Sequence, residues 1–325
     1  MQTGEAMVEL WRGPLLESVH RGHAVIWGPG GLERSWGNPE EIVFPRSSAK
    51  MVQALPLIES GAAAAFGLGP EHLALACASH NGAEIHTSRV ARWLDHIGRG
   101  DDDLRCGPQE PQDVPARDGL IRAHSGPCQM HNNCSGKHAG FLTLAKHLGA
   151  GPEYNDPDHP VQRAAREAQE RLTGEESYGF GIDGCSAPNF AFSLQGVARA
   201  MAAFAAAPDG SAEATLRNAM TAHPDLVAGE GRACTLLMRA MEGRVALKTG
   251  TEGFFIAIIP EKRMGVALKI VDGTRRAAEC AIAAILVQLG VLKADHPATL
   301  EFLNAPIRNW RGIQTGWQRA APGLI

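Results

Sequence analysis

The sequence has few aromatic residues, little charge imbalance and no long hydrophobic run. Only 6% of its 325 residues are aromatic, which argues against the stacking surfaces that bind single-stranded nucleic acid. The formal net charge of -4 gives no reason to expect nucleic acid or an anionic membrane as a partner. The longest alanine-rich stretch, residues 196–207, is interrupted by Arg199 and is too short for a membrane span. We therefore expect a soluble protein with neither kind of partner.

The N-terminal residues also lack the basic region and following apolar stretch of a secretory signal. The chain has 7 cysteines, an odd number, scattered without regular spacing. This distribution does not resemble a disulfide framework and suits a reducing compartment. The sequence therefore predicts a cytoplasmic protein.

The order of strand-like and helix-like segments predicts an α+β fold. With 44% hydrophobic residues the chain can bury a substantial core, and no repeat or low-complexity linker divides it. We expect residues 1–325 to form a single catalytic domain. Its antiparallel sheet, flanked by helices, would come from residues 1–45 and 244–325, and a helical lobe would come from residues 46–243.

Local signals place individual elements within this plan. Pro260 to Arg263 separates two β-rich runs and predicts a hairpin. Residues 101–118, rich in proline and aspartate, predict an exposed excursion. The spacing of apolar residues and the terminal glycines predict helices over residues 135–148, 159–172, 190–207 and 274–289.

Three short motifs follow one another along the chain. Ser47 and Lys50 are three residues apart just after a proline, so they share a face if a helix begins there. Ser79-His80-Asn81 and Lys248-Thr249-Gly250 come later. A capped, solvated helix start explains most Ser-x-x-Lys matches. The ordered set Ser-x-x-Lys, Ser-x-Asn and Lys-Thr-Gly, however, is that of serine β-lactamases and penicillin-binding proteins.

The chemistry explains why serine and lysine would gather. A serine hydroxyl is a weak nucleophile until a neighbouring base takes its proton. A lysine amine can act as that base once burial or a second nearby cation favours its neutral form. Two serine–lysine pairs around one pocket would therefore activate each other.

Longer strings point away from penicillin chemistry. They are N-C-S-G-K-H-A-G-F-L at 133–142, G-I-D-G-C-S-A-P-N-F at 181–190, H-P-D-L-V-A-G-E-G-R at 223–232 and L-K-I-V-D-G at 268–273. Together with R-S-S-A-K and C-A-S-H-N, these strings resemble the Rhizobium-etli-type (class 3) L-asparaginases from about Val8 to Gly290. The resemblance implies a serine β-lactamase-like fold, hydrolysis of L-asparagine to L-aspartate and ammonia, a homodimer, and a metal site, often zinc.

The resemblance also implies roles for individual residues. Ser47 with Lys50 and Ser79 with Lys248 would be the two catalytic pairs. Arg46, Asp183 and His138 would contribute to substrate binding. Cys134, Lys137 and Cys185 would be the metal ligands. Which serine attacks stays open at this stage, although Ser47 has the nucleophile's position by analogy with Ser-x-x-Lys enzymes.

Each of these residues has a less specific interpretation. By spacing alone, Cys134 and Cys185 would be ordinary buried thiols, and Lys137 can bind a cation only when neutral. A divalent metal can displace that proton, and two sulfurs with one amine would leave one tetrahedral position open. Cys185 could instead be a thiolate nucleophile, since a helix starting near Pro188 would lower its pKa.

Other functions stay open beside the asparaginase. One is a β-lactamase or D-alanyl carboxypeptidase, although the absence of a signal peptide argues against substrates outside the cytoplasm. Another is a metal-dependent binding or sensor protein. Glutaminase activity is a finer alternative, because one methylene is worth only ~1–3 kcal/mol of discrimination.

Overall fold

The computed structural model describes residues 3–325, which divide into two compact units. Unit 1 consists of the chain up to Ser48, of Phe192–Ala206 and of Leu236–Ile325. Unit 2 consists of Ala49–Ala191 and Ala207–Thr235. Unit 1 is built around a sheet and unit 2 is mainly helical, so the predicted α+β class is confirmed. The assignment of both to one catalytic domain stays a prediction.

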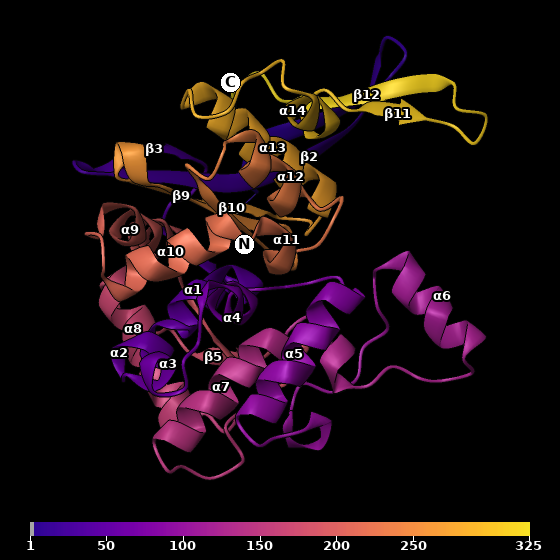
Figure 1. Ribbon diagram of the computed structural model, residues 1–325. Helices are drawn as coiled ribbons and strands as arrows, with labels where there is room; N and C mark the ends of the chain where they lie inside the picture. The colour runs from indigo at the N-terminus through magenta and orange to yellow at the C-terminus, as the bar shows by residue number, and fades with distance from the viewer. Residues whose placement is uncertain (1–2) are drawn as a thin grey trace. The chain divides into compact units, whose positions relative to one another are not determined.

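Unit 1 contains a large antiparallel sheet (Figure 1). In the described part of the chain it has 8 strands in the order β11-β12-β1-β2-β10-β9-β8, and β3 pairs with β2 beside this path. The strands are β1 (Glu5–Arg12), β2 (Leu15–Gly28), β3 (Gly31–Trp36), β8 (Ala246–Gly250), β9 (Phe254–Ile259), β10 (Met264–Ile270), β11 (Pro306–Arg308) and β12 (Gln314–Ala320). A short pair, β4 (Ile42–Val43) with β7 (Phe192–Ser193), precedes helix α9 (Leu194–Ala206).

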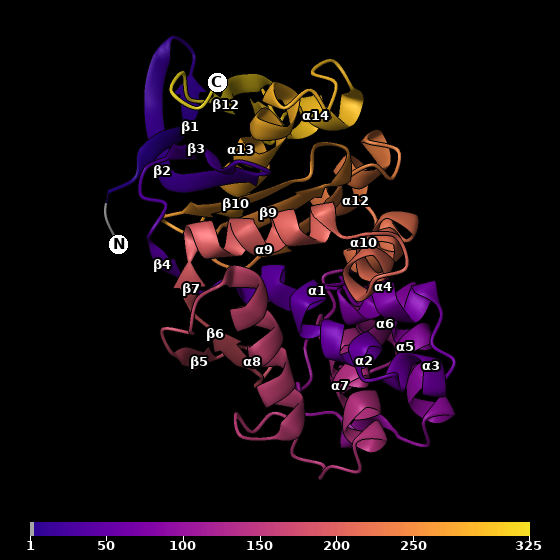
Figure 2. The same ribbon diagram turned by 90° about the vertical axis from the view of Figure 1, so that its left-hand side faces the viewer.

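Helices cover both faces of this sheet. Figure 2 shows β9 and β10 with α13 (Arg275–Gln288) on one side and α9 on the other. Every residue of β9 is buried, which fits a strand covered on both faces. Gly265 of β10 lies so close to α9 that a β-carbon there would be 2.3 Å from the Ala198 carbonyl oxygen. The glycine therefore permits α9 to pack directly on the sheet.

The remaining helical elements of unit 1 are short. The predicted hairpin at 260–263 is present: η4 (Pro260–Lys262) and Arg263 in the left-handed region join β9 to β10. Helix α14 (Pro297–Phe302) packs against α13. Two elements contain residues of both units, η1 (Arg46–Ala49) and α12 (Ala233–Ala240).

Unit 2 is organised around helix α7 (Ser135–His147), which packs against α2, α3, α4, α5 and α8. Its residues from Ser135 to Ala145 are all buried, including the polar side chains of Lys137 and His138. The other elements are α1 (Lys50–Gln53), α2 (Leu55–Glu59), α3 (Ala62–Ala65), α4 (Pro70–Ala76), α5 (Glu84–His96), η2 (Asp101–Asp103), α6 (Val114–Arg122), η3 (Gln129–His131), α8 (Pro160–Thr173), β5 (Phe180–Ile182), β6 (Pro188–Phe190), α10 (Ala212–Ala222) and α11 (Pro224–Val227).

One local prediction is confirmed and one is wrong. The excursion over 101–118 is mostly exposed or half-buried, and it contains η2 and the start of α6, which begins where Asp113 accepts a hydrogen bond from the Ala116 N–H. No helix starts near Pro188, because Pro188–Phe190 is strand β6 and pairs with β5. The turn between them is closed by hydrogen bonds from Asp183 N to Ala187 O and from Ser186 N to Asp183 O.

Within residues 3–325, no helix combines the length and apolar character needed to cross a membrane.

Candidate active site

In unit 1, the segment that carries Ser47 lies against strand β8. Ser48 N donates to the Pro45 carbonyl, and the Ser48 hydroxyl donates a 2.9 Å hydrogen bond to the Lys248 carbonyl. A β-carbon on Gly250 would lie 2.7 Å from the Pro45 carbonyl oxygen, so only a glycine permits this approach. The predicted nucleophile and Lys248 are therefore brought to one edge of the sheet by backbone contacts.

Lys248 itself is almost fully buried, with 1% of its surface exposed. Its Nζ donates a 2.8 Å hydrogen bond to the carbonyl of the next residue, Thr249. A lysine is rarely buried to this extent without a functional or structural partner. This burial is a property that the Lys-Thr-Gly motif alone does not predict.

In unit 2, Lys50 and Ser79 are in direct contact. Lys50 is the first residue of α1 and is 1% exposed, and Ser79 follows α4 and is 7% exposed. Lys50 Nζ donates a 2.9 Å hydrogen bond to Ser79 Oγ and a second to the Ala78 carbonyl. The sequence pairs Lys50 with Ser47 and Ser79 with Lys248. The Lys50–Ser79 contact joins members of the two predicted pairs, and no spacing rule could have predicted it.

His80 fixes the loop that carries Ser79. Its backbone N–H donates to the Asn133 carbonyl, and its Nδ1 accepts from the Gly82 N–H. With Nδ1 an acceptor, Nε2 carries the proton and donates a 2.9 Å hydrogen bond to the Ser135 hydroxyl. The serine loop is thereby tied to the first turn of α7. Burial, together with the charges of His86 and Lys50, lowers the pKa of His80 well below its ordinary value.

The predicted metal ligands form a buried cluster at the same end of α7. Cys134 precedes the helix, and Cys185 lies in the β5–β6 turn, where Ser186 has a strained φ of 67°. Lys137 Nζ donates a 3.1 Å hydrogen bond to Cys185 Sγ. Cys134, Lys137 and Cys185 are each at most 4% exposed. The sequence-based grouping of these three side chains is thus present in unit 2.

The surroundings shift the pKa values of Cys185 and Cys134 in opposite directions. A hydrogen bond from Cys134, reinforced by Lys137 and His138, lowers the pKa of Cys185 well below its ordinary value. The Cys134–Cys185 contact and burial raise the pKa of Cys134. Burial alone would lower the pKa of Lys137, but the charges of Cys185, Cys134 and Asp183 together outweigh it and raise this pKa. These shifts favour the thiolate form of Cys185, the thiol form of Cys134 and the ammonium form of Lys137.

These donors fit a zinc ion. Among residues 3–325 no three or more His, Cys, Asp and Glu side chains converge to hold a metal, so a site with three protein donors here would have to include Lys137. Ligands of a tetrahedral zinc with bonds of about 2.0–2.3 Å lie roughly 3.6 Å apart. The 3.1 Å between Lys137 Nζ and Cys185 Sγ needs only a small change, together with the loss of protons from Lys137 and Cys134.

His138 adjoins this cluster from within the core. It is 0% exposed, and its Nδ1 lies 2.9 Å from Tyr154 Oη. Its buried Nε2 has no hydrogen-bond partner among residues 3–325, and Cys185 is near enough for its charge to act on the ring. Because Tyr154 Oη accepts a hydrogen bond from Arg105 N at 2.7 Å, its own proton goes to His138 Nδ1. Burial lowers the pKa of His138 to about 4. The spacing of residues in the sequence does not place a histidine beside Cys185, but in the structure His138 lies near it.

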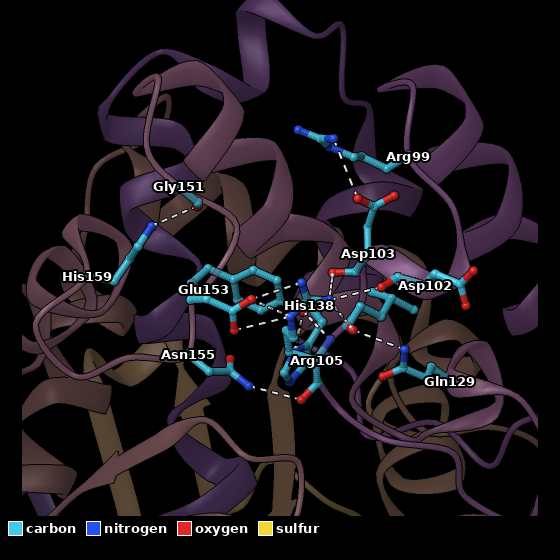
Figure 3. Close-up of polar contacts among 12 residues, drawn as sticks. Arg99, Asp102, Asp103, Arg105, Gln129, His138, Gly151, Glu153, Asn155 and His159 are labelled. Atoms are coloured by element: carbon cyan, nitrogen blue, oxygen red, sulfur yellow. Dashed lines mark hydrogen bonds and ion pairs between the residues drawn. The ribbon is translucent and has the colours of Figure 1, made fainter.

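Figure 3 shows how Arg105 is held beside His138. Its guanidinium pairs with Glu153 at 3.0 Å and donates to the Asp102 and Asp103 carbonyls, and its own carbonyl accepts from Asn155. Arg105 and Tyr154 have no motif around them, so sequence reasoning missed both. The other predicted substrate-binding residue of unit 2, Asp183, is half-buried in the β5–β6 turn, where its carboxylate accepts from the Gly184 N–H at 2.6 Å.

A buried lysine that hydrogen-bonds a serine hydroxyl, as Lys50 does with Ser79, is an arrangement that can activate a serine for nucleophilic catalysis. A protein-family model described as L-asparaginase II matches residues 8–320. The chain therefore belongs to the L-asparaginase II family. It is an L-asparaginase, a hydrolase that converts L-asparagine to L-aspartate and ammonia.

Solved structures resemble this chain at low sequence identity. A β-lactamase (Mb2281c) from Mycobacterium bovis has a TM-score of 0.46 and 14% identity over 82% of this chain and 94% of its own. A class C β-lactamase from Rhodobacter sphaeroides has a TM-score of 0.42 and 15% identity, over 83% and 95%. Mglu, solved in its tris and glutamate form, has a TM-score of 0.46 and 14% identity over 90% of this chain, which spans 64% of Mglu. No curated protein matches the sequence.

Proposed function

We propose that this L-asparaginase works by acyl transfer to a serine, with buried lysines moving the protons. The observation that carries the proposal is the hydrogen bond of 2.9 Å between Lys50 Nζ and Ser79 Oγ. Lys50 donates two hydrogen bonds, to Ser79 and to the Ala78 carbonyl. A neutral amine keeps two N–H groups for these acceptors and one lone pair for an incoming proton. Lys50 can therefore accept a proton as a base while both of its hydrogen bonds are kept.

Atoms and protons balance in the proposed steps. Ser47 Oγ attacks the side-chain amide carbon of L-asparagine, and its proton moves to Lys50 Nζ. The carbon–nitrogen bond breaks as the leaving nitrogen receives a proton through the Ser79 hydroxyl, which is replenished from Lys50, and ammonia departs. Water then attacks the Ser47 ester and gives a proton to neutral Lys50, which returns it to Ser47 Oγ as the ester bond breaks, and the released product is L-aspartate. Lys248 is the second basic residue of this scheme.

Arg46 is the proposed partner of the substrate carboxylate, since it directly precedes Ser47 and a guanidinium suits a carboxylate. The burial of His138 supports a role in orienting Cys185 rather than contact with substrate. The half-buried carboxylate of Asp183 would act on the same cluster, because its charge favours the ammonium form of Lys137.

Zinc is the proposed metal, and Cys134, Lys137 and Cys185 would hold it. When bound, the ion would supply a fixed positive charge able to orient or polarise a carbonyl group. His138 would direct its Nε2–H at Cys185, and Tyr154 would keep the histidine in the required tautomer.

A homodimer and a cytoplasmic location complete the proposal. All 7 cysteines are free in the structure, which supports a reducing environment. Tyr178, Phe180 and Ile182 alternate along one exposed face at β5, and each is at least half exposed, which supports association through this strand.

Two neighbouring serines provide the test. Ser47→Ala should abolish ammonia release from L-asparagine, whereas Ser48→Ala should keep turnover and lose about 1 kcal/mol of stability with its hydrogen bond to Lys248. Retained turnover in Ser47→Ala would transfer the nucleophile's role to Ser79. Ammonia release from glutamine and labelling by a fluorescent penicillin, measured on the same preparations, test the glutaminase and β-lactamase alternatives.

A further inference from the structure

Unit 1 contains a cavity of about 360 Å³ beside the start of η1. Ile42, Phe44 and Val271 give it an apolar wall. Arg46, Glu252, Lys269 and Asp272 give it two cationic and two anionic groups. Ligand sites have volumes of about 300–1,000 Å³, so this cavity suits a small molecule. Its balanced charge suits a ligand that carries both signs.

Two residues of this cavity have strained backbones. Arg46 has a φ of 51° and Glu252 a φ of 59°, a region that non-glycine residues enter at a cost of roughly 1–3 kcal/mol. Only five other non-glycine residues in the described chain, 3–325, have a positive φ. Such strain collects at ligand sites, and here it places one cation and one carboxylate on a single cavity.

A buried lysine holds the strained turn. Lys269, 5% exposed, donates a 2.7 Å hydrogen bond from Nζ to the Glu252 carbonyl and another to the Ile270 carbonyl. Gly253 follows with a φ of 66°, and a β-carbon there would lie 2.9 Å from Ile270 Cβ. The Glu252 carboxylate itself rests against Gly273, whose β-carbon would be 2.7 Å from Oε2. Three neighbours thus fix where this carboxylate lies.

Of the two acidic groups, Asp272 is held by hydrogen bonds to its carboxylate, whereas Glu252 interacts with Lys269 through its charge. Asp272 Oδ2 accepts from His20 Nδ1 at 2.6 Å, and Oδ1 accepts from the Thr274 N–H at 2.9 Å. Within residues 3–325, no side chain or backbone N–H donates to the Glu252 carboxylate. A carboxylate held at energetic cost beside a cavity, without a donor of its own, is available to a cationic group of a ligand.

We propose that this cavity binds the α-amino acid end of the substrate and that Glu252 accepts hydrogen bonds from the α-ammonium group. The inference rests on the proposed function, in which Arg46 takes the α-carboxylate. Arg46 and Ser47 are consecutive, with Cα atoms about 3.8 Å apart, a separation comparable to the length of asparagine itself. Glu252 therefore determines the preference for L-asparagine over an analogue that lacks the α-amino group.

The test compares L-asparagine with succinamate, which lacks only the α-amino group. Wild type should prefer L-asparagine in kcat/KM, and Glu252→Gln should reduce that preference roughly 10–100-fold, the worth of a charge-assisted hydrogen bond. Most of the loss should lie in KM for L-asparagine, with succinamate turnover unchanged. Glu242→Gln is the matched control, because Glu242 is also a glutamate of unit 1 with a positive φ, 53°, and does not line the cavity.

A second variant guards against misfolding. Glu252→Gly removes the carboxylate and relieves the strained φ, so it should keep or raise the thermal midpoint while losing the same preference. Asp183→Asn, which removes the rival carboxylate of unit 2, should leave the preference unchanged. An unchanged preference in both Glu252 variants, or its loss in Asp183→Asn instead, would overturn the inference.

Product binding separates this inference from the proposed function. By calorimetry, wild type should bind L-aspartate more tightly than succinate, and Glu252→Gln should bind the two alike. If wild type releases no ammonia but shows this pattern, the proposed function fails and the cavity assignment stands. If ammonia is released but the two ligands bind equally to wild type, the cavity assignment fails alone.

Discussion

Gly229 and Asn81 are in such close contact that a β-carbon on Gly229 would lie 2.5 Å from the amide carbon of Asn81. Gly229 also has a φ of 116°, which L side chains rarely adopt. Asn81 belongs to the Ser-x-Asn motif, and its carbonyl accepts from the Asp113 N–H. Gly229 thus sets the position of the loop that carries Ser79.

We therefore expect Gly229→Ala to displace Asn81 and lower kcat for ammonia release at least tenfold. Gly231→Ala is the control, since Gly231 has a φ of 72° but no atom within 4 Å of the point where a β-carbon would lie. Both variants should lose roughly 1–2 kcal/mol of stability to backbone strain, measured by urea unfolding. Equal kcat in the two variants would show that the contact with Asn81 is unimportant.

Lys50→Met should separate catalysis from stability. Methionine fills a similar volume without the buried charge, so the free energy of unfolding should hold or rise. The loss of the base should lower kcat by about 10²–10⁴-fold. Lys146→Met is the control, because Lys146 also donates to a carbonyl, that of Ile97, at 2.6 Å in unit 2. Comparable turnover in the two variants would remove Lys50 from the mechanism.

The buried His80 predicts a specific dependence of stability on pH. Its pKa is lowered in the folded state, chiefly by burial, so the unfolded chain binds a proton near pH 6.5 that the folded chain does not. Above that pH, His80 does not reduce the free energy of unfolding. Below it, the preference of the unfolded chain for the proton lowers this free energy by up to about 1.4 kcal/mol per pH unit. His80→Gln should flatten the decline between pH 7 and 5 by this slope, as followed by urea unfolding. Parallel curves for the two proteins would contradict the assignment.

Cys185→Ser should weaken zinc binding. Changes that leave the ligands in place already cost about 10–100-fold in metal affinity, so loss of a ligand should cost more. Competition with a chromophoric chelator measures the affinity without reference to activity. Cys280→Ser is the control, since Cys280 is a fully buried thiol whose pKa burial raises to about 12. Equal affinities would place the metal elsewhere.

The sequence predicts features that depend on neighbours in the chain. Helix α7 ends close to the predicted residue because Gly149 follows it with a φ of 62°. The hairpin at 260–263 and the α+β class follow from local turn and periodicity signals. Strand β6 was missed because Pro188 resembles a helix start until its partner, β5, is known.

The sequence likewise predicts the residues of the candidate site better than the contacts between them. Motifs single out Ser47, Lys50, Ser79 and Lys248, but the Lys50–Ser79 hydrogen bond joins residues 29 positions apart. Tyr154 acts on His138 from 16 positions away, in a segment with no motif. Glu252 is one glutamate among many until its φ of 59° and the hydrogen bond from Lys269 to its carbonyl are known. These relationships arise from tertiary packing, which spacing rules do not contain.

The arrangement of strands has a consequence for synthesis on the ribosome. Strand β12 pairs with β1, joining Val8 to Ala320, so β1 gains this second neighbouring strand only after Ala320 has been made. Every residue of unit 2 precedes Leu236 and has been made by then. All residues of the helical unit are therefore available to fold before the strand that completes the pairing of β1 has been synthesised.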